Sequence, residues 1–330
     1  MGAARTLTSV ITARLDADTL ARVRLACSPA AEVTAWLGLA ARRGRHPVFG
    51  DPGAAARAVL HDPDAALVAG VLPVDGGPAY TPDLLTPKPG PMSSRVLDDQ
   101  LDLIASTPPE TVAEQVDAIG RPLPSAVRDA VDRGTFAPRA ALGLRRFWAG
   151  ALASGWSQLQ STMEADLAVR AGTMATRGVG ALLDSLHEAI SWRDGTLTIR
   201  STWHEEFNLA DVEVVCVPAV LAWPKLSVQL CDARDAVLGY PAAGVGVPAG
   251  GRAIDKLVGP TRAALLRDLD VPRSTAGLAG RHSLSAPTIS YHLKVLQRAG
   301  LVVAHRDGQF VLYRRTDAGS TLASFAGHGG

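Results

Sequence analysis

The sequence predicts a mostly helical α+β fold, built from a large N-terminal domain and a smaller C-terminal domain. Apolar residues recur at helical spacing over much of 30–190, and short β-rich runs bounded by prolines follow over 191–240. A third segment, 252–330, has the pattern helix, tight turn, helix and hairpin. With 330 residues, 47% apolar and 20% charged, the chain is long enough to bury a sizeable core.

Composition sets the expected domain boundaries. Residues 1–245 are expected to form the N-terminal domain, and the Pro- and Gly-rich residues 246–251 are expected to form a linker. Residues 252–330 form the C-terminal domain in this prediction.

Charge is divided unequally between these domains. Residues 252–315 contain 11 Lys and Arg against 4 Asp and Glu, whereas residues 1–251 contain 22 against 27. The net charge of +1 therefore conceals a basic C-terminal module on a mildly acidic body. A basic module of this kind suits a polyanionic partner such as nucleic acid, and its binding should depend strongly on salt.

The N-terminal domain is expected to be mainly helical, because apolar residues recur there every three or four positions. The expected helices span residues 30–43, 52–61, 94–106, 109–119, 124–134 and 175–190. The strongest signal is a stripe with gaps of 4, 4, 4, 3, 4 and 4, which predicts one long helix bent near Gly155. The stripe consists of Leu144, Trp148, Leu152, Trp156, Leu159, Met163 and Leu167.

Two interpretations of the stripe stay open. Its spacing is typical of a helix-bundle core. In the other interpretation, Trp148, Trp156 and Met163 line the pocket of a small-molecule effector, because apolar pockets between helices are common ligand sites.

A small antiparallel sheet is expected to pack on these helices. Strands are predicted at residues 8–15, 212–217, 225–230 and 236–240. Between two further β-rich runs, Asp194-Gly195 predicts a tight hairpin turn. The Pro- and Gly-rich residues 74–91 predict an ordered loop or a linker.

The C-terminal domain contains one helix whose two ends are both marked in the sequence. Ser285 is expected to cap it, Pro287 fits its first turn, and Gly300 is expected to end it. Between these signals, an apolar face consists of Ile289, Leu293 and Leu296. The opposite face has small residues at its start and basic residues further on. Such a face suits a helix whose first turn reaches base edges in a major groove.

Two β-rich runs follow this helix, at 301–306 and 309–315. Asp307-Gly308 between them predicts a two-residue hairpin connection. Arg306, Arg314 and Arg315 flank the hairpin. A helix-turn-helix followed by a basic hairpin is a winged helix-turn-helix.

At this point the chain resembles a known family. Leu278-Ala279, followed by Leu284-Ser285-x-Pro-Thr-Ile-Ser-x-His-Leu-Lys-Val-Leu-x-x-Ala-Gly-Leu-Val, is similar to the ArsR-type winged-helix transcriptional regulators. The match covers about Ile254 to Thr316. The resemblance implies a homodimeric DNA-binding regulator, here a repressor, acting on a palindromic operator.

The N-terminal domain also resembles a domain of unknown function that is fused to such regulators in actinobacteria. The resembling blocks are Ser28-Pro29 with Glu32, Tyr80-Thr-Pro-Asp-Leu-Leu-Thr-Pro, Phe147-Trp148, Pro218…Trp223-Pro224 and Tyr240-Pro241. No chemistry is assigned to these blocks. An actinobacterial origin also agrees with 29 arginines against 4 lysines, a bias typical of GC-rich genomes.

Ten residues of the C-terminal domain are candidate DNA contacts. Those expected to read base edges are Ser285, Pro287, Ser290 and Tyr291. Those expected to contact phosphates are Thr288, Lys294, Arg298, Arg306, Arg314 and Arg315. For each position, an ordinary solvated surface residue is the alternative interpretation.

No catalytic, metal or cofactor site is expected. His187-Glu188 and His204-Glu205 begin like a zinc-protease motif, but both lack the second histidine. The three cysteines, Cys27, Cys216 and Cys231, are widely spaced and are expected to be buried thiols, with a redox pair of the last two as the alternative. The metal-sensing branch of the resembled family is disfavoured, because residues 273–281 contain no cysteine.

Three functional classes remain open. A repressor controlled by a small ligand in the N-terminal domain comes first, a constitutive DNA-binding regulator comes second, and an enzyme with a DNA-binding tail comes third. In each case a cytoplasmic protein, associated with the nucleoid through DNA, is expected, because no run of about 18 apolar residues and no secretory signal is present.

Overall fold

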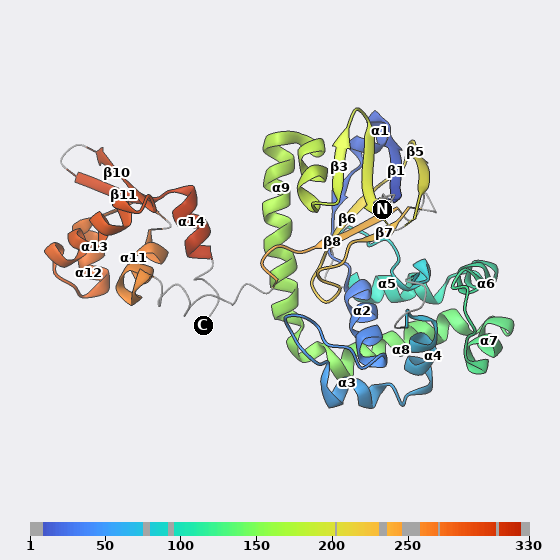
Figure 1. The fold of residues 1–330 in the computed structure, drawn as a ribbon. Coiled ribbons are helices and arrows are strands. Elements are labelled where there is room, and N and C mark those ends of the chain that lie inside the picture. The colour runs from blue at the N-terminus through green and yellow to red at the C-terminus, as the bar shows by residue number, and fades with distance from the viewer. Residues whose placement is uncertain are drawn as a thin grey trace, which may run out of the picture. The chain divides into compact units, whose positions relative to one another are not determined.

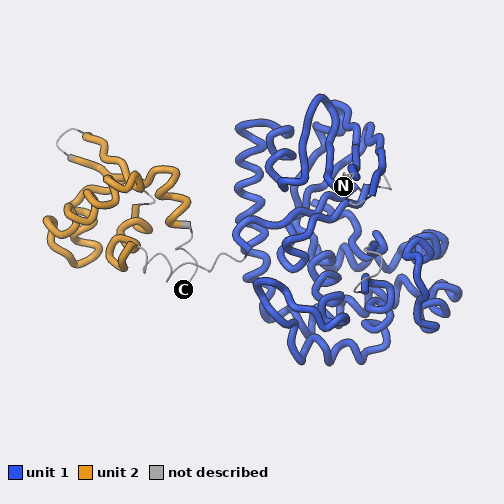
Figure 2. Tube along the Cα trace, in the orientation of Figure 1, with its two compact units in different colours: residues 1–245 blue, residues 246–330 orange. Residues whose placement is uncertain are grey.

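The structure is a computed structural model of the chain. It describes residues 9–74, 80–91, 96–201, 203–230, 236–245, 258–269, 271–307 and 310–324. The chain divides into two compact units, residues 1–245 and residues 246–330 (Figure 2). The predicted linker 246–251 lies outside the described residues.

Unit 1 is mostly helical, as predicted (Figure 1). Its helices are α1 (Ala17–Ala21), α2 (Pro29–Ala41), α3 (Gly53–Val59), α4 (Pro63–Val71), α5 (Val96–Ala105), α6 (Pro109–Asp117), α7 (Ser125–Asp132), α8 (Phe136–Ala151) and α9 (Trp156–Leu186), with 3₁₀ turns η1 (Asp83–Leu85) and η2 (Ala153–Gly155). Helix α8 lies at the centre and packs against α3, α4 and α5. Its side chains Phe136, Leu144 and Phe147 are fully buried in the larger core of the unit.

Helices α4 and α8 approach each other very closely. An ideal Cβ built on Gly143 of α8 would lie 2.4 Å from the backbone oxygen of Asp64. At the same contact, Asp64 forms an ion pair with Arg139 at 2.6 Å and with Arg146 at 3.0 Å. The close crossing of α4 and α8 therefore requires glycine at position 143, and two charge-assisted contacts of Asp64 lie beside it.

The predicted long helix over the apolar stripe is two helices. Helix α8 ends at Ala151, η2 follows, and α9 begins at Trp156. The break lies at the bend predicted near Gly155, and the apolar spacing continues across it from Leu152 to Trp156. Periodicity therefore could not reveal the break.

The helix predicted at 175–190 is the end of α9, which has one non-helical residue inside it. Gly178 has φ 82° and ψ 170°, a conformation that side-chain-bearing residues rarely adopt. Nη1 of Arg170 donates to the Ser185 hydroxyl at 3.0 Å, so the short segment after Gly178 is tied to the long one before it.

Two four-stranded sheets pack with α9 around a second core. The first has the order β3-β4-β1-β5 and the second has the order β2-β6-β8-β7. Their strands are β1 (Ser9–Leu15), β2 (Arg24–Leu25), β3 (Ile190–Arg193), β4 (Thr196–Ser201), β5 (Glu205–Leu209), β6 (Val215–Ala219), β7 (Ser227–Gln229) and β8 (Val237–Pro241).

The prediction of a purely antiparallel sheet was wrong in this detail. Strand β1 pairs parallel with β5, and β6 pairs parallel with both β2 and β8. Parallel neighbours need long crossover connections, and the helices between β2 and β6 supply one. The predicted Asp194-Gly195 hairpin is confirmed, since Arg193 pairs with Thr196 and both turn residues have positive φ.

The loop predicted at 74–91 is ordered where the structure describes it. Thr34 of α2 donates to the Leu85 carbonyl at 3.2 Å, and Gln100 of α5 donates to the Pro87 carbonyl at 2.9 Å. The Leu84 amide donates to Gln115 of α6 at 2.7 Å. Three helices thus hold this loop through polar side chains.

Unit 2 has the predicted winged helix-turn-helix topology. Its elements are α11 (Pro260–Asp268), β9 (Arg273–Ser274), α12 (Thr275–His282), α13 (Ala286–Arg298), β10 (Val302–Asp307), β11 (Phe310–Arg315) and α14 (Asp317–Ser324). Strands β10, β11 and β9 form an antiparallel sheet. The predicted apolar face Ile289, Leu293 and Leu296 is fully buried in the core of the unit.

The wing connection differs by one residue from the prediction. Asp307 pairs with Phe310, so the two connecting residues are 308 and 309 rather than Asp307-Gly308. Both connecting residues lie outside the described part of the chain.

Among the helices of the described ranges, none combines the length and the hydropathy needed to cross a bilayer.

Candidate nucleic-acid interface

Both helices of the helix-turn-helix begin at a capping serine, and a left-handed residue lies in the turn between them. Ser274 caps α12 by accepting from the Gly277 amide at 3.1 Å. Ser283 then reverses the chain in a left-handed conformation, with φ 52° and ψ 38°. Ser285 caps α13 by accepting from the Thr288 amide at 3.3 Å, as predicted. The cap fixes the start of α13 and thereby orients its first turn.

Four candidate residues form one exposed stripe along α13. Pro287, Tyr291, Lys294 and Arg298 follow each other at gaps of 4, 3 and 4, so they share a face at about 100° per residue. All four are exposed, and Tyr291 has 65% of its surface accessible. The stripe lies opposite the buried apolar face, which leaves it available to an external partner.

The candidates Thr288 and Ser290 on α13 are less exposed than the four residues of the stripe. Thr288 is half-buried, and its hydroxyl lies 2.7 Å from the Ser285 hydroxyl. Both side chains therefore take part in the helix cap. Ser290 is also half-buried and flanks the exposed stripe.

The three wing arginines do not share a face. Opposite residues of paired strands lie on the same side of a sheet, and side chains alternate along each strand. Arg315 pairs with the buried Val302, and Arg306 lies on that same side at an even spacing. Arg314 pairs with the exposed Val303 and projects from the other side.

Sequence reasoning missed a charge cluster behind the helix-turn-helix. The Asp268 carboxylate, at the end of α11, accepts from Arg281 at 2.7 Å and lies 3.3 Å from Nε of Arg273 and 3.1 Å from Nε2 of His282. The hydrogen bond from Arg281 is the main cause that holds the pKa of Asp268 below its usual value. Part of the basic charge counted in the sequence is thus already neutralised inside the unit. No local signal marks this cluster, because its members lie on three elements.

Comparison with known proteins agrees with this geometry. Residues 257–304 match a family model described as a helix-turn-helix domain. Unit 2 is a winged helix-turn-helix domain. The chain is also 42% identical over 55 residues to the transcriptional repressor SdpR of Bacillus subtilis (strain 168).

The similarity to SdpR covers 16% of this chain and 61% of that relative. A solved structure, reduced HlyU from Vibrio cholerae N16961, is 28% identical over 21% of this chain and 79% of its own, with a TM-score of 0.19. The family model and the similarity to SdpR confirm the predicted helix-turn-helix resemblance of the C-terminal unit.

The candidate effector residues lie in the core of unit 1. Met163 is fully buried, and Trp148 and Trp156 pack on the same cluster from its edge. Nε1 of Trp148 is buried and has no hydrogen-bond partner within the described ranges. The assignment of an effector to these residues stays a prediction.

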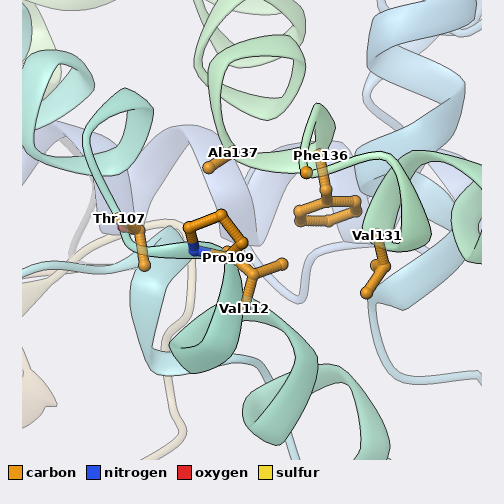
Figure 3. A pocket seen from close by; sticks show the side chains of 7 residues that line it. Thr107, Pro109, Val112, Val131, Phe136 and Ala137 are labelled. Carbon is orange, nitrogen blue, oxygen red and sulfur yellow. The ribbon is translucent and has the colours of Figure 1, made fainter.

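A small hollow lies elsewhere on unit 1, and Figure 3 shows the side chains around it. Its lining residues come from α6, α7, α8, the turn between α7 and α8, and the connection before α6: Thr107, Pro109, Val112, Val131, Gly134, Phe136 and Ala137. The candidate effector residues do not contribute to this lining.

Two of the three cysteines are described. Cys216 is buried, and burial raises its pKa to about 12. Burial is also the main cause that raises the pKa of Cys27 to about 12. Both thiols are therefore protonated at neutral pH, which disfavours reactivity. Cys231, the other half of the alternative redox pair, lies outside the described residues.

Proposed function

We propose that this chain is a transcriptional repressor of the ArsR type that binds a palindromic operator as a homodimer. The observation that carries the proposal is the exposed stripe of Pro287, Tyr291, Lys294 and Arg298 on a capped helix of a helix-turn-helix domain. An α-helix with this profile fits a major groove, with its first turn toward the base edges.

Each part of the interface has a role in the proposal. Pro287, Ser290 and Tyr291 contact base edges, and Ser285 with Thr288 positions the first turn against them. Lys294 and Arg298 contact phosphates further along α13. The wing arginines contact the DNA backbone, with Arg314 on one face of the hairpin and Arg306 with Arg315 on the other.

The proposal also includes a homodimer whose DNA binding is controlled by a small-molecule effector. Two-fold protein symmetry matches a palindromic operator, because each copy then reads one half-site in the same way. Unit 1 supplies the dimer contact and holds a small-molecule effector beside Trp148, Trp156 and Met163. The protein acts in the cytoplasm, on nucleoid DNA, and the proposed function includes no catalytic step.

The decisive experiment is fluorescence anisotropy of the full chain with DNA from its own upstream region and with a scrambled duplex. We expect tight binding to the upstream DNA, with an affinity that falls by about 10³-fold or more between about 50 and 200 mM salt. Weak, equal binding to both duplexes would mean that the operator lies outside the upstream region and would direct the search to other DNA. An absence of binding at low salt would overturn the DNA-binding proposal.

A further inference from the structure

A tight loop after α2 presents basic and apolar side chains together on the surface of unit 1. We call residues 42–50 the basic loop. Arg43 and Arg45 are exposed, and a third arginine lies half-buried beside them. Val48 and Phe49, at the tip of the loop, are 39% and 42% exposed. Unit 1 is mildly acidic as a whole, so the basic loop is a local reversal of its charge.

The basic loop is held in one shape by His46, which is only 4% exposed. Its Nδ1 accepts from the Val48 and Phe49 amides, at 3.1 Å in each case. The backbone groups of His46 and Gly50 exchange two hydrogen bonds, of 2.7 and 2.9 Å. The His46 ring also packs edge-on against Trp36 of α2. The exposed tip therefore has a fixed shape before any partner binds, which lowers the entropic cost of binding.

The guanidinium groups of Arg43 and Arg45 form no ion pair with a residue that the structure describes. Asp51, the first acidic residue after the loop, pairs instead with Arg57. The pKa of Asp51 is lowered chiefly by hydrogen bonds from the Gly53 amide and from Arg57, and least by the charge of Arg45. The positive charge of the basic loop is thus available to an external anion.

Arg43 occupies a backbone position that suits glycine. Its φ is 53°, and its amide donates to the Ala40 carbonyl at the end of α2. Glycine or asparagine is the usual residue in this left-handed conformation at the end of a helix. An arginine there indicates a use for its side chain. If that use were only a favourable interaction with the helix dipole, loss of the charge would lower stability and leave ligand binding unchanged.

We propose that the basic loop is a second DNA-binding site, which contacts phosphates of duplex DNA through Arg43 and Arg45 and the adjoining sugars through Phe49. Guanidinium groups bind phosphate oxygens through paired N–H donors. Contacts with phosphate and sugar carry no sequence information, so this site adds affinity for any duplex. The choice of DNA among polyanions rests on the proposed function, which already brings duplex DNA to this chain.

Fluorescence anisotropy of the full chain with a scrambled duplex, several times longer than an operator, tests the site. The double variant Arg43→Asn, Arg45→Gln removes both charges, and asparagine tolerates the positive φ at position 43. We expect the slope of log affinity against log salt to fall by about 2, because each phosphate contact contributes about 0.9. An unchanged slope would overturn the proposal.

Two control variants and one uncharged substitution make this result specific. Arg43→Lys with Arg45→Lys keeps both charges and should keep the wild-type slope. Arg128→Gln removes an exposed arginine of α7 and should also keep it. Phe49→Ala should weaken binding by the same factor at every salt concentration, because the ring carries no charge. A slope that falls as much for Arg128→Gln would show a response to net charge alone and would overturn the site.

The same measurements separate this site from the interface on α13. A fall in slope for Lys294→Ala alone would overturn the basic loop and leave the proposed function standing. A fall for the double variant alone would support the basic loop and contradict the interface on α13. Vesicles of phosphatidylcholine and anionic phosphatidylglycerol test the other polyanionic surface. Loss of vesicle binding by the double variant, with an unchanged slope on DNA, would overturn the DNA site in favour of a lipid site.

Discussion

The hydroxyl groups of Ser285 and Thr288 lie 2.7 Å apart, and the Ser285 oxygen also accepts from the Thr288 amide. These two residues close the first turn of α13. They therefore govern the orientation of the helix face that carries Tyr291 and Lys294.

Loss of this cap should destabilise unit 2. Ser285→Ala leaves a first-turn amide without its acceptor, which costs about 1 kcal/mol at a helix N-terminus. Urea unfolding followed by a probe in unit 2 should show a lower midpoint. Ser320→Ala, at an exposed serine on α14, should change the free energy of unfolding by less than about 0.5 kcal/mol. Equal effects of both substitutions would mean that the cap does not stabilise α13.

Lys294 should contribute charge to DNA binding without sequence preference. We expect Lys294→Ala to weaken binding to operator and scrambled DNA alike, and to reduce the slope of log affinity against log salt by about 1 for each lysine in contact with a phosphate. Arg177→Ala removes an exposed charge from α9 and should leave the slope unchanged. An unchanged slope for Lys294→Ala would remove this residue from the interface.

Asp268 should stabilise unit 2 in a pH-dependent manner. The pKa of its carboxyl is lowered in the folded chain, chiefly by the hydrogen bond from Arg281. The ionised carboxyl therefore adds to the free energy of unfolding above the ordinary pKa of 3.8, and this contribution is lost as the pH falls through the pKa of the folded chain. Asp268→Asn lacks this contribution at every pH. Unfolding curves of the wild type and the variant should therefore differ at pH 7 and converge as the pH falls through the lowered folded-state pKa of Asp268. If the difference in stability between wild type and Asp268→Asn stayed constant as the pH falls, the ionised carboxylate would not be the cause of that difference.

Two glycine-to-alanine substitutions should change the stability of unit 1 in opposite directions. Gly143→Ala places a methyl group 2.4 Å from the Asp64 carbonyl oxygen, which should force α4 and α8 apart and cost about 2–3 kcal/mol. Gly172→Ala on α9 meets nothing within 4 Å and should stabilise the helix by up to about 1 kcal/mol. Thermal unfolding of unit 1 measures both. A neutral Gly143→Ala would show that the two helices can separate without cost.

Sequence alone determined the elements whose causes are local. The boundaries of α13 follow from Ser285, Pro287 and Gly300, and its buried face follows from spacing within thirteen residues. The hairpin at Asp194-Gly195 follows from two residues that tolerate positive φ. Such signals act between neighbours in the chain, so they can be recognised from the sequence without the tertiary structure.

Tertiary structure decided what depends on residues far apart. The hydrogen bonds that Glu32 accepts from the Val220 and Leu221 amides join separate elements. So do the contacts of Asp268 with Arg273, Arg281 and His282, and the parallel pairing of β6 with β2. The sequence predicted a bend near Gly155, but not that the helix ends there and a new one begins after the 3₁₀ turn, because the apolar spacing continues across the break. Hydrophobic periodicity states which side of an element is buried, but the partner that buries it is chosen only when the whole chain packs.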